Sequence, residues 1–210
     1  MPTGIKAVIF DMGGVFIRTL DLSGRRQMAQ KYGMSVQKLN DLFFKSPIAI
    51  ESEKGLVSRA ELLQYTLRQL EDPEEDVEAF VAEFFSRDEE DQELVQFVRA
   101  LKSHYKLALL SNAFEGTRQW MQERFTFLDL FEISIFSYEV GMRKPDEQIY
   151  RLVLDKLQVE PQEALFVDDF KENIEGAQRL GMQTVWYYPR DAALAELKSR
   201  LLPSVPLRSA

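Results

Sequence analysis

Val8-Ile9-Phe10-Asp11-Met12-Gly13-Gly14-Val15 is typical of a buried strand that ends in a carboxylate and a two-glycine turn. Because glycine permits unusual backbone angles and close approach, the amides of Met12 and Gly13 can point at an anion bound beside Asp11. A strand that ends in aspartate before a glycine turn is also common as a purely structural turn. The stretch predicts a strand, and the rest of the chain decides its function.

Further short apolar runs alternate with longer segments of helical periodicity. This alternation predicts an α/β fold in which helices cover a parallel sheet. The expected strands are Lys6–Phe10, Lys106–Leu110, Ile133–Phe136, Ala164–Val167 and Thr184–Tyr187.

Four of these strands are followed by polar or charged residues. In an open α/β sheet the ligand crevice lies beyond the carboxyl ends of the strands, so residues far apart in sequence meet there. The residues expected to converge are Asp11, Ser111-Asn112, Ser137 and Asp168-Asp169.

The segment between the first two expected strands is far longer than a right-handed crossover requires. We expect residues 17–87 to form an inserted all-helical subdomain and residues 1–16 and 88–210 to form the α/β core. The expected helices of the insert are Ser23–Tyr32, Val36–Phe44, Arg59–Leu70 and Glu74–Phe85.

Two connecting segments of this region have a structural and a functional interpretation. Ile50–Gly55 is a candidate rim of the crevice, although an exposed connector between helices is favoured. Arg87–Asp91 is most simply a solvated connector or a helix N-terminus.

The composition excludes several classes of chemistry. The 210 residues contain no cysteine and one histidine, which rules out disulfides, thiolate zinc sites and cysteine nucleophiles. The formal net charge of −8 repels phosphate backbones, so we expect neither nucleic acid nor a membrane surface as a partner. No apolar run approaches the roughly 20 residues of a membrane helix, and the N-terminus lacks a signal-peptide pattern, so we expect a cytoplasmic location.

Two further motifs offer groups that can bind an anion. Ser111-Asn112 can donate to a phosphate oxygen or cap the next helix, and capping is favoured for this pair in isolation. In Gly141–Asp146, Pro145 fixes the start of a helix over Glu147–Leu157 and holds Lys144 at its N-terminus, a position suited to an anion. A solvated lysine is the alternative.

The last motif is Asp168-Asp169 at the end of a buried strand. Adjacent carboxylates there are costly unless a cation or good donors neutralise them. Mg²⁺ prefers hard oxygen ligands and needs only one or two carboxylates, a carbonyl and a phosphate oxygen. We expect a magnesium site formed by Asp11, the Gly13 carbonyl and Asp169, with Asp168 and Asn173 in support.

These ordered motifs resemble those of the haloacid dehalogenase superfamily of Mg²⁺-dependent phosphohydrolases, over nearly the whole chain. Asp11 lies in the nucleophile loop, Ser111 in the second motif, Lys144 in the third and Asp168-Asp169 in the fourth. The resemblance implies a Rossmann-like three-layer core with a helical cap inserted after the first motif. The chain is most similar to sugar-phosphatase-like members, including the bacterial α-D-glucose-1-phosphate phosphatase, over Leu110–Asn112, Gly141–Pro145 and Asp169–Ala177.

The resemblance also implies a role for each site residue. Asp11 attacks phosphorus to form an aspartyl-phosphate that water hydrolyses, and Lys144 neutralises charge on the phosphoryl oxygens. The residues implied to bind the phosphoryl group are Met12, Gly13, Ser111, Asn112 and Lys144.

Gly13 departs from the common pattern of the superfamily. Most of its phosphatases have an aspartate at this position, two residues after the nucleophile, which protonates the leaving alcohol. Loss of general acid–base catalysis costs about 10²–10⁴-fold in rate. A slow enzyme, a substrate with a good leaving group and a substitute acid are the possibilities that remain open.

The favoured hypothesis is a phosphomonoesterase, active as a monomer or homodimer, that acts on a small phosphorylated metabolite such as a sugar phosphate. A 2-haloacid dehalogenase would also use Asp11 and would not need the missing acid, but carbon–halogen displacement needs no bound cation. The alternative from another class is a phosphate-binding or regulatory protein with weak or no turnover. In that case the glycine at position 13, in place of the usual aspartate, would be the sign of the lost activity.

Overall fold

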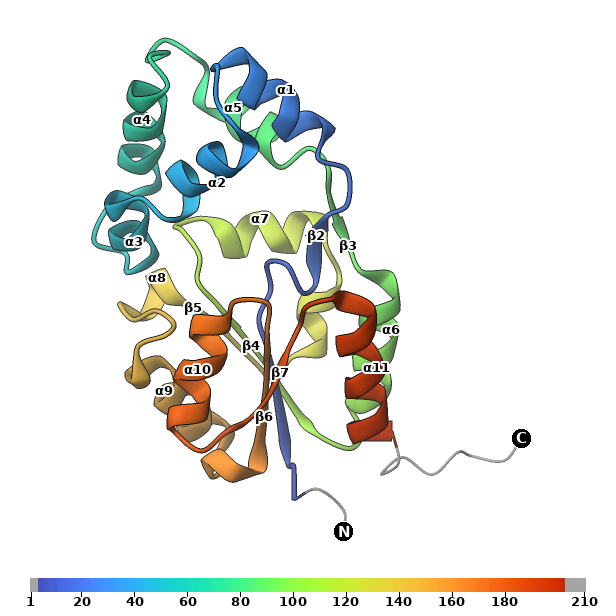
Figure 1. The fold of residues 1–210 in the computed structure, drawn as a ribbon. Helices are drawn as coiled ribbons and strands as arrows, with labels where there is room; N and C mark the ends of the chain where they lie inside the picture. Colours follow the sequence, from blue (N-terminus) through green and yellow to red (C-terminus); the bar gives the residue numbers. More distant parts are fainter. Residues whose placement is uncertain (1–3, 203–210) are drawn as a thin grey trace.

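The computed structural model describes residues 4–202, and its core is a five-stranded parallel sheet in the order β5-β4-β1-β6-β7 (Figure 1). Each predicted strand is present, with its ends within one residue of the prediction. The central strand β1 pairs with β4 on one side and β6 on the other. The strands are β1 (Ala7–Phe10), β4 (Lys106–Ser111), β5 (Ile133–Phe136), β6 (Ala164–Asp168) and β7 (Gln183–Trp186).

Helices cover both faces of the sheet, so the predicted three-layer α/β core is confirmed. Successive residues of β1 point to opposite faces, because side chains alternate along a strand. Val8 and Phe10 pack with α6 (Gln92–Leu101) and α11 (Arg190–Leu201). Ala7 and Ile9 pack with α9 (Glu147–Leu157) and α10 (Lys171–Arg179). All four residues are fully buried, which explains why the strand is apolar throughout.

A second lobe of helices lies beyond the carboxyl ends of the strands (Figure 1). It has its own apolar core, in which Phe43 stacks on Phe84 at 4.6 Å between ring centroids. Ser58 and Glu61 form the capping box that opens its fourth helix. The helices are α1 (Ser23–Lys31), α2 (Val36–Phe44), α3 (Pro47–Glu53), α4 (Arg59–Gln69) and α5 (Val77–Phe84).

An antiparallel ribbon of β2 (Ile17–Thr19) and β3 (Asp88–Glu90) joins this lobe to the core. Of the two interpretations of residues 87–91, the helix N-terminus is confirmed at Asp91, whereas the solvated connector is wrong, because Asp88 and Asp91 are largely buried in ion pairs. Arg25 donates to Asp88 and Arg190 to Asp91. Asp91 also caps α6. The positively charged partners come from distant parts of the chain. The local sequence of the acidic run therefore does not indicate that its side chains are buried and paired.

Three other sequence expectations about the lobe need correction. Residues 50–55 are not an exposed connector, because Ile50–Glu53 belong to α3 and Glu53 is buried. Helix α5 begins at Val77 and not at Glu74, because the Asp76 side chain caps it by accepting from the amide of Ala79. Helices α1, α4 and α5 each end one residue earlier than expected, at Lys31, Gln69 and Phe84.

Core elements near the ends of β4 and β5 contact the helical lobe. Phe114, which follows β4, packs against Phe43 and Phe44 of α2. Trp120 of α7 (Thr117–Arg124) packs against Phe85, just after α5. The short helix α8 (Ser137–Val140) contacts α3. None of the helices within residues 4–202 is long and apolar enough to cross a bilayer.

Candidate active site

Three central strands deliver polar residues to one edge of the sheet, as the sequence predicts. Asp11 directly follows β1, and its amide donates to the Val167 carbonyl of β6 at 2.8 Å. Ser111 and Asp168 are the last residues of β4 and β6. All three side chains are buried, with exposed fractions of 6% or less. Parallel pairing in register therefore places these residues side by side at the end of the sheet.

Lys144 reaches this point from the loop before α9 and is the central cation of the site. Its Nζ lies 2.5 Å from Asp11 Oδ1 and 2.7 Å from Asp168 Oδ2. The lysine is 1% exposed, which excludes the solvated alternative. Burial disfavours the charge on Lys144, but the two carboxylates outweigh burial and hold its pKa above the ordinary range.

Asn112 positions Lys144. Its Nδ2 donates to the Lys144 carbonyl at 3.0 Å, and its Oδ1 accepts from the Lys144 amide at 2.8 Å. These two bonds fix the main chain on both sides of the lysine Cα. The sequence predicts that Asn112 binds the phosphoryl group, but both polar atoms of its side chain are hydrogen-bonded to the main chain of Lys144.

Asp168 and Asp169 have different surroundings although they are adjacent. Asp168 accepts from the Asn173 side chain at 3.0 and 3.1 Å and from the Phe170 amide at 2.8 Å. Asp169 Oδ1 is buried and has no hydrogen-bond partner among the described residues. The Trp186 indole donates to the Asp169 carbonyl at 2.8 Å and so fixes this part of the main chain.

Three carboxylates can share one metal ion at this place. Single oxygens of Asp11, Asp168 and Asp169 lie within 4.8 Å of one another. The turn after β1 leaves room for Asp169 only because residue 14 is glycine: a Cβ there would lie 2.2 Å from Asp169 Oδ2. The site contains three carboxyl groups and one ammonium group, and one carboxylate oxygen has no partner among the described residues. This excess of acidic oxygen atoms suits a hard cation that prefers oxygen ligands.

Burial raises the pKa of Asp11 to about 7 and that of Asp169 to about 8. Asp168 raises both pKa values further, because like charges oppose ionisation. Lys144 acts in the opposite direction on both groups, yet it does not overcome burial. A bound cation would favour the ionised form of both carboxyl groups.

The remaining predicted residues lie around this cluster. Ser111 is 1% exposed, and its hydroxyl donates to the Asn112 carbonyl at 3.3 Å. The Met12 carbonyl accepts from the amides of Phe16 and Ile17 at 2.8 and 3.1 Å, which closes the turn after β1. Gly13 is exposed, and no atom lies within 4 Å of the place where its Cβ would be. Ser137 accepts from the Ala113 amide at 2.9 Å and so supports the loop after β4.

Sequence reasoning missed the contribution of the helical lobe. Glu53 at the end of α3 accepts from the Nε of Arg143 at 2.6 Å. Only the packing of helix α3 near a core loop 90 residues away brings these charges together. The available signal was the pair of adjacent cations, Arg143 and Lys144, in an acidic chain.

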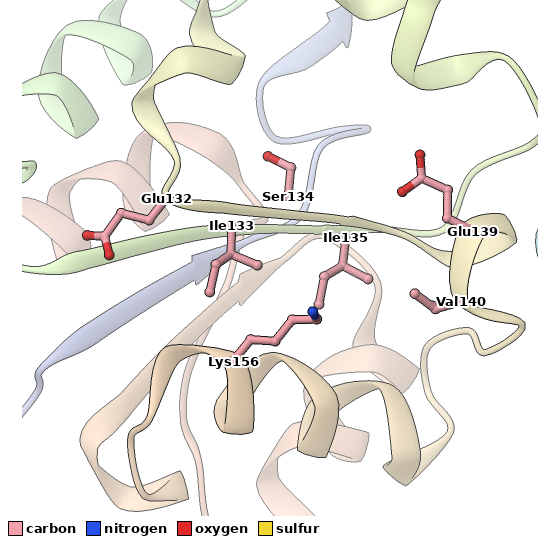
Figure 2. A pocket seen from close by; sticks show the side chains of 7 residues that line it. All are labelled: Glu132, Ile133, Ser134, Ile135, Glu139, Val140 and Lys156. Atoms are coloured by element: carbon pink, nitrogen blue, oxygen red, sulfur yellow. The ribbon is translucent and has the colours of Figure 1, made fainter.

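Two surface cavities lined by described residues bear on the location of the site. One of about 490 Å³ lies along β5, lined by Ile133, Ser134, Ile135 and Lys156 among others (Figure 2). None of the predicted site residues lines it. The second, of about 420 Å³, touches Gly14 and Asp169. Of these two cavities, the second adjoins the carboxylate cluster.

Comparison with known proteins agrees with this geometry. The chain belongs to the haloacid dehalogenase-like hydrolase family, whose model matches residues 5–181. The D-ribitol-5-phosphate phosphatase of Bacteroides thetaiotaomicron is 29% identical over 200 residues, which cover 90% of this chain and 94% of that protein. A haloacid dehalogenase family enzyme from the same organism, solved with magnesium and inorganic phosphate, has a TM-score of 0.71 at 28% identity, covering 86% of this chain and 92% of that one.

Another relative has a higher sequence identity over a shorter stretch and is a larger protein. Bifunctional epoxide hydrolase 2 of Sus scrofa is 46% identical over 68 residues, or 32% of this chain. The match spans 12% of that protein, so this chain corresponds to a small part of it.

Proposed function

We propose that this protein is a Mg²⁺-dependent phosphomonoester hydrolase that acts on a small phosphorylated carbohydrate through an aspartyl-phosphate on Asp11. The observation that carries the proposal is the buried contact of Lys144 with Asp11, beside an Asp169 oxygen that has no partner among the described residues. The site then combines three groups: Asp11 as the nucleophile, Lys144 as a fixed cation for the phosphoryl oxygens, and an Asp169 oxygen that is free to bind a metal ion.

Magnesium is the metal that the donor set favours, because the three acidic side chains offer only hard oxygen ligands. Asp11, the Gly13 carbonyl and Asp169 would hold it, while Asn173 keeps Asp168 in place. When bound, the ion would neutralise charge on the phosphoryl oxygens and orient them. The structural relative with magnesium and inorganic phosphate supports this assignment.

The reaction follows from the positions of the chain's own residues. The free oxygen of Asp11 attacks phosphorus in line, the bond to the leaving oxygen breaks, and an acyl phosphate forms on Asp11. Lys144 stays protonated and stabilises the charge on the phosphoryl oxygens throughout. Water then attacks phosphorus, which releases phosphate and restores the Asp11 carboxylate. Ser111 and the Gly13 amide are the remaining donors for the phosphoryl group.

Gly13 determines which leaving groups react fastest. It carries no side chain that could give a proton to the departing oxygen, so the rate depends on how well the alcohol leaves unaided. An anomeric sugar phosphate, whose leaving group is comparatively good, suits this site. The carboxylate cluster favours phosphoryl transfer over dehalogenation, which needs no cation, and a pure phosphate binder has little need of a buried nucleophile.

The helical lobe selects the substrate in this proposal. We infer that residues 17–87 act as a cap on a core formed by residues 1–16 and 88–210. In-line attack from Asp11 directs the leaving group away from the sheet and toward this lobe. The D-ribitol-5-phosphate phosphatase among the relatives supports a polar leaving group.

Phosphate release by the purified chain tests the proposal. A panel of sugar phosphates and an activated aryl phosphate would be assayed with Mg²⁺ and with chelator, beside Asp11→Asn. We expect release that the chelator abolishes and that Asp11→Asn lacks while keeping the wild-type melting temperature. Release from every substrate in the presence of chelator would contradict the role of the metal, and no release from any substrate would favour the binding protein.

A further inference from the structure

Strand β7, at one edge of the sheet, holds the main chain of both Asp168 and Asp169. It pairs in parallel with β6, and Trp186 lies opposite Asp168. The Tyr187 amide donates to the Asp168 carbonyl at 2.8 Å, and the Trp186 indole Nε1 donates to the Asp169 carbonyl at 2.8 Å. Because β6 ends at Asp168, a side chain of β7 takes over from the main-chain ladder at Asp169.

The peptide group between Asp169 and Phe170 is hydrogen-bonded on both sides. Its carbonyl accepts from Trp186, and its N–H, which belongs to Phe170, donates to Asp168 Oδ1 at 2.8 Å. Two bonds on opposite edges of a planar group fix its rotation. The Tyr187 amide holds the peptide group before Asp169 by its carbonyl. With the peptide groups on both sides held, the Cα–Cβ bond of Asp169 has a fixed direction.

The carboxylate of Asp169 depends on this main-chain anchor. Its Oδ1 is buried and has no hydrogen-bond partner among the described residues, and its Oδ2 lies against Gly14. The carboxylate of Asp168, by contrast, is held directly by donors from Asn173 and Lys144. A metal ligand that keeps an oxygen free cannot be oriented by donors to that oxygen, so its orientation has to come from the main chain.

The chemistry of Trp186 suits this role. The residue is 36% exposed, so burial of its ring is only part of what it contributes. The ring is held from its faces and edges, with Lys171 Nζ at 4.4 Å from its centroid and the Tyr188 ring at 5.4 Å between centroids. The indole N–H is a donor that carries no charge. It therefore fixes the carbonyl without adding a positive charge that would oppose a metal ion nearby.

We propose that Trp186 is a positioning residue of the metal site, which directs Asp169 toward the ion by holding the peptide group between residues 169 and 170. This inference rests on the proposed Mg²⁺-dependent function and deepens it by naming a residue outside the ligand set. Trp186 contacts neither the ion nor the substrate in this scheme. Loss of its N–H frees the peptide group to rotate, and the Asp169 carboxylate then loses its fixed direction.

The test is the affinity of the full chain for Mg²⁺, measured by titration calorimetry in the wild type, Trp186→Phe and Trp120→Phe. Trp186→Phe keeps an aromatic ring at the end of β7 and removes the donor. Loss of an outer partner of a metal ligand costs about 10–100-fold in metal affinity, and we expect about 10-fold here because water can reach the partly exposed position. At saturating Mg²⁺ the kcat of Trp186→Phe should return close to the wild-type value, because the affected step is metal binding.

Trp120→Phe is the matched control, because it makes the same change at the other tryptophan of the chain, which packs against Phe85, and we expect its Mg²⁺ affinity to be unchanged. A second variant replaces Trp186 with its benzothiophene analogue, which keeps the shape of the ring but has sulfur in place of the N–H, and its affinity should fall as well. Wild-type affinity in both Trp186 variants, whatever their melting temperatures, would mean that the indole serves packing alone and would overturn the inference. A wild-type chain that binds no Mg²⁺ would instead contradict the proposed metal-dependent function, and this inference with it.

Discussion

Replacing Gly14 with alanine should disable the site through a single added methyl group. A Cβ at position 14 would lie 2.2 Å from Asp169 Oδ2 and 2.5 Å from Asp169 Cγ. Ordinary van der Waals contacts of a Cβ atom are 3.4 Å or longer. The carboxylate must therefore retreat by about 1.2 Å, the difference between the ordinary and the imposed distance. Asp169 is the proposed ligand with the unpaired oxygen, so this displacement acts directly on metal binding.

Two effects of different size follow from this substitution. A misplacement of about 1 Å costs on the order of 10²-fold in activity, so kcat/KM should fall by roughly that factor or more. Gly14 also has a φ of 75°, and a side chain in left-handed backbone costs roughly 1–2 kcal/mol. For a chain of this size that cost lowers the melting temperature by about 2–8 °C.

Gly181→Ala separates the clash from the backbone strain. Gly181 has a φ of 85° and lies in an exposed turn after α10, and nothing lies within 4 Å of its Cβ position. Both variants should lose similar stability in thermal melts, but only Gly14→Ala should lose phosphatase activity and affinity for Mg²⁺. If Gly14→Ala is as active as Gly181→Ala, then Asp169 does not bind the metal in the position described here.

Further predictions concern the same site. Gly13→Asp has open space for its side chain, and a carboxyl group there should raise kcat on alkyl phosphates by about 10-fold or more while changing aryl phosphate hydrolysis little; equal effects on both would show that it supplies no proton. Because burial raises the pKa of Asp11 to about 7 and of Asp169 to about 8, the metal-free chain should lose stability as pH rises from about 4 to about 8. Over the same range the increase in melting temperature on adding Mg²⁺ should grow, and a pH-independent increase would place the ion elsewhere. Asn112→Ala should lower kcat for all substrates about 10-fold by loosening Lys144, whereas an effect on KM alone would indicate direct phosphate binding.

Much of the core of the site follows from local sequence. The buried strands are short apolar runs, and the polar residues that end them meet because parallel strands share one edge. Asp11, Ser111 and Asp168 could be placed together on this ground alone. Lys144 comes from a loop outside the sheet, and only the structure shows that it is buried between two carboxylates.

Local sequence is a poor guide wherever a charge is neutralised from a distance. Residues 87–91 look solvated because their cationic partners, Arg25 and Arg190, lie 63 and 99 residues away from Asp88 and Asp91. Residues 50–55 look like a connector for the same reason, since Arg143, the partner of Glu53, is 90 residues distant. Sequence shows the number of charges, whereas burial and pairing depend on which elements pack together.

By itself, the sequence determined the parallel sheet, the inserted helices, the absence of thiol chemistry and the set of oxygen and amine groups at the strand ends. These properties depend on periodicity and composition, which are local. The tertiary structure decided which two carboxylates are paired with Lys144 and which one is left with an unpaired oxygen. It also decided that Asn112 holds the lysine main chain and that Glu53 reaches the core. The reason is physical: the cost or gain of a buried charge is set by the groups packed within a few ångströms of it, and these come from every part of the chain.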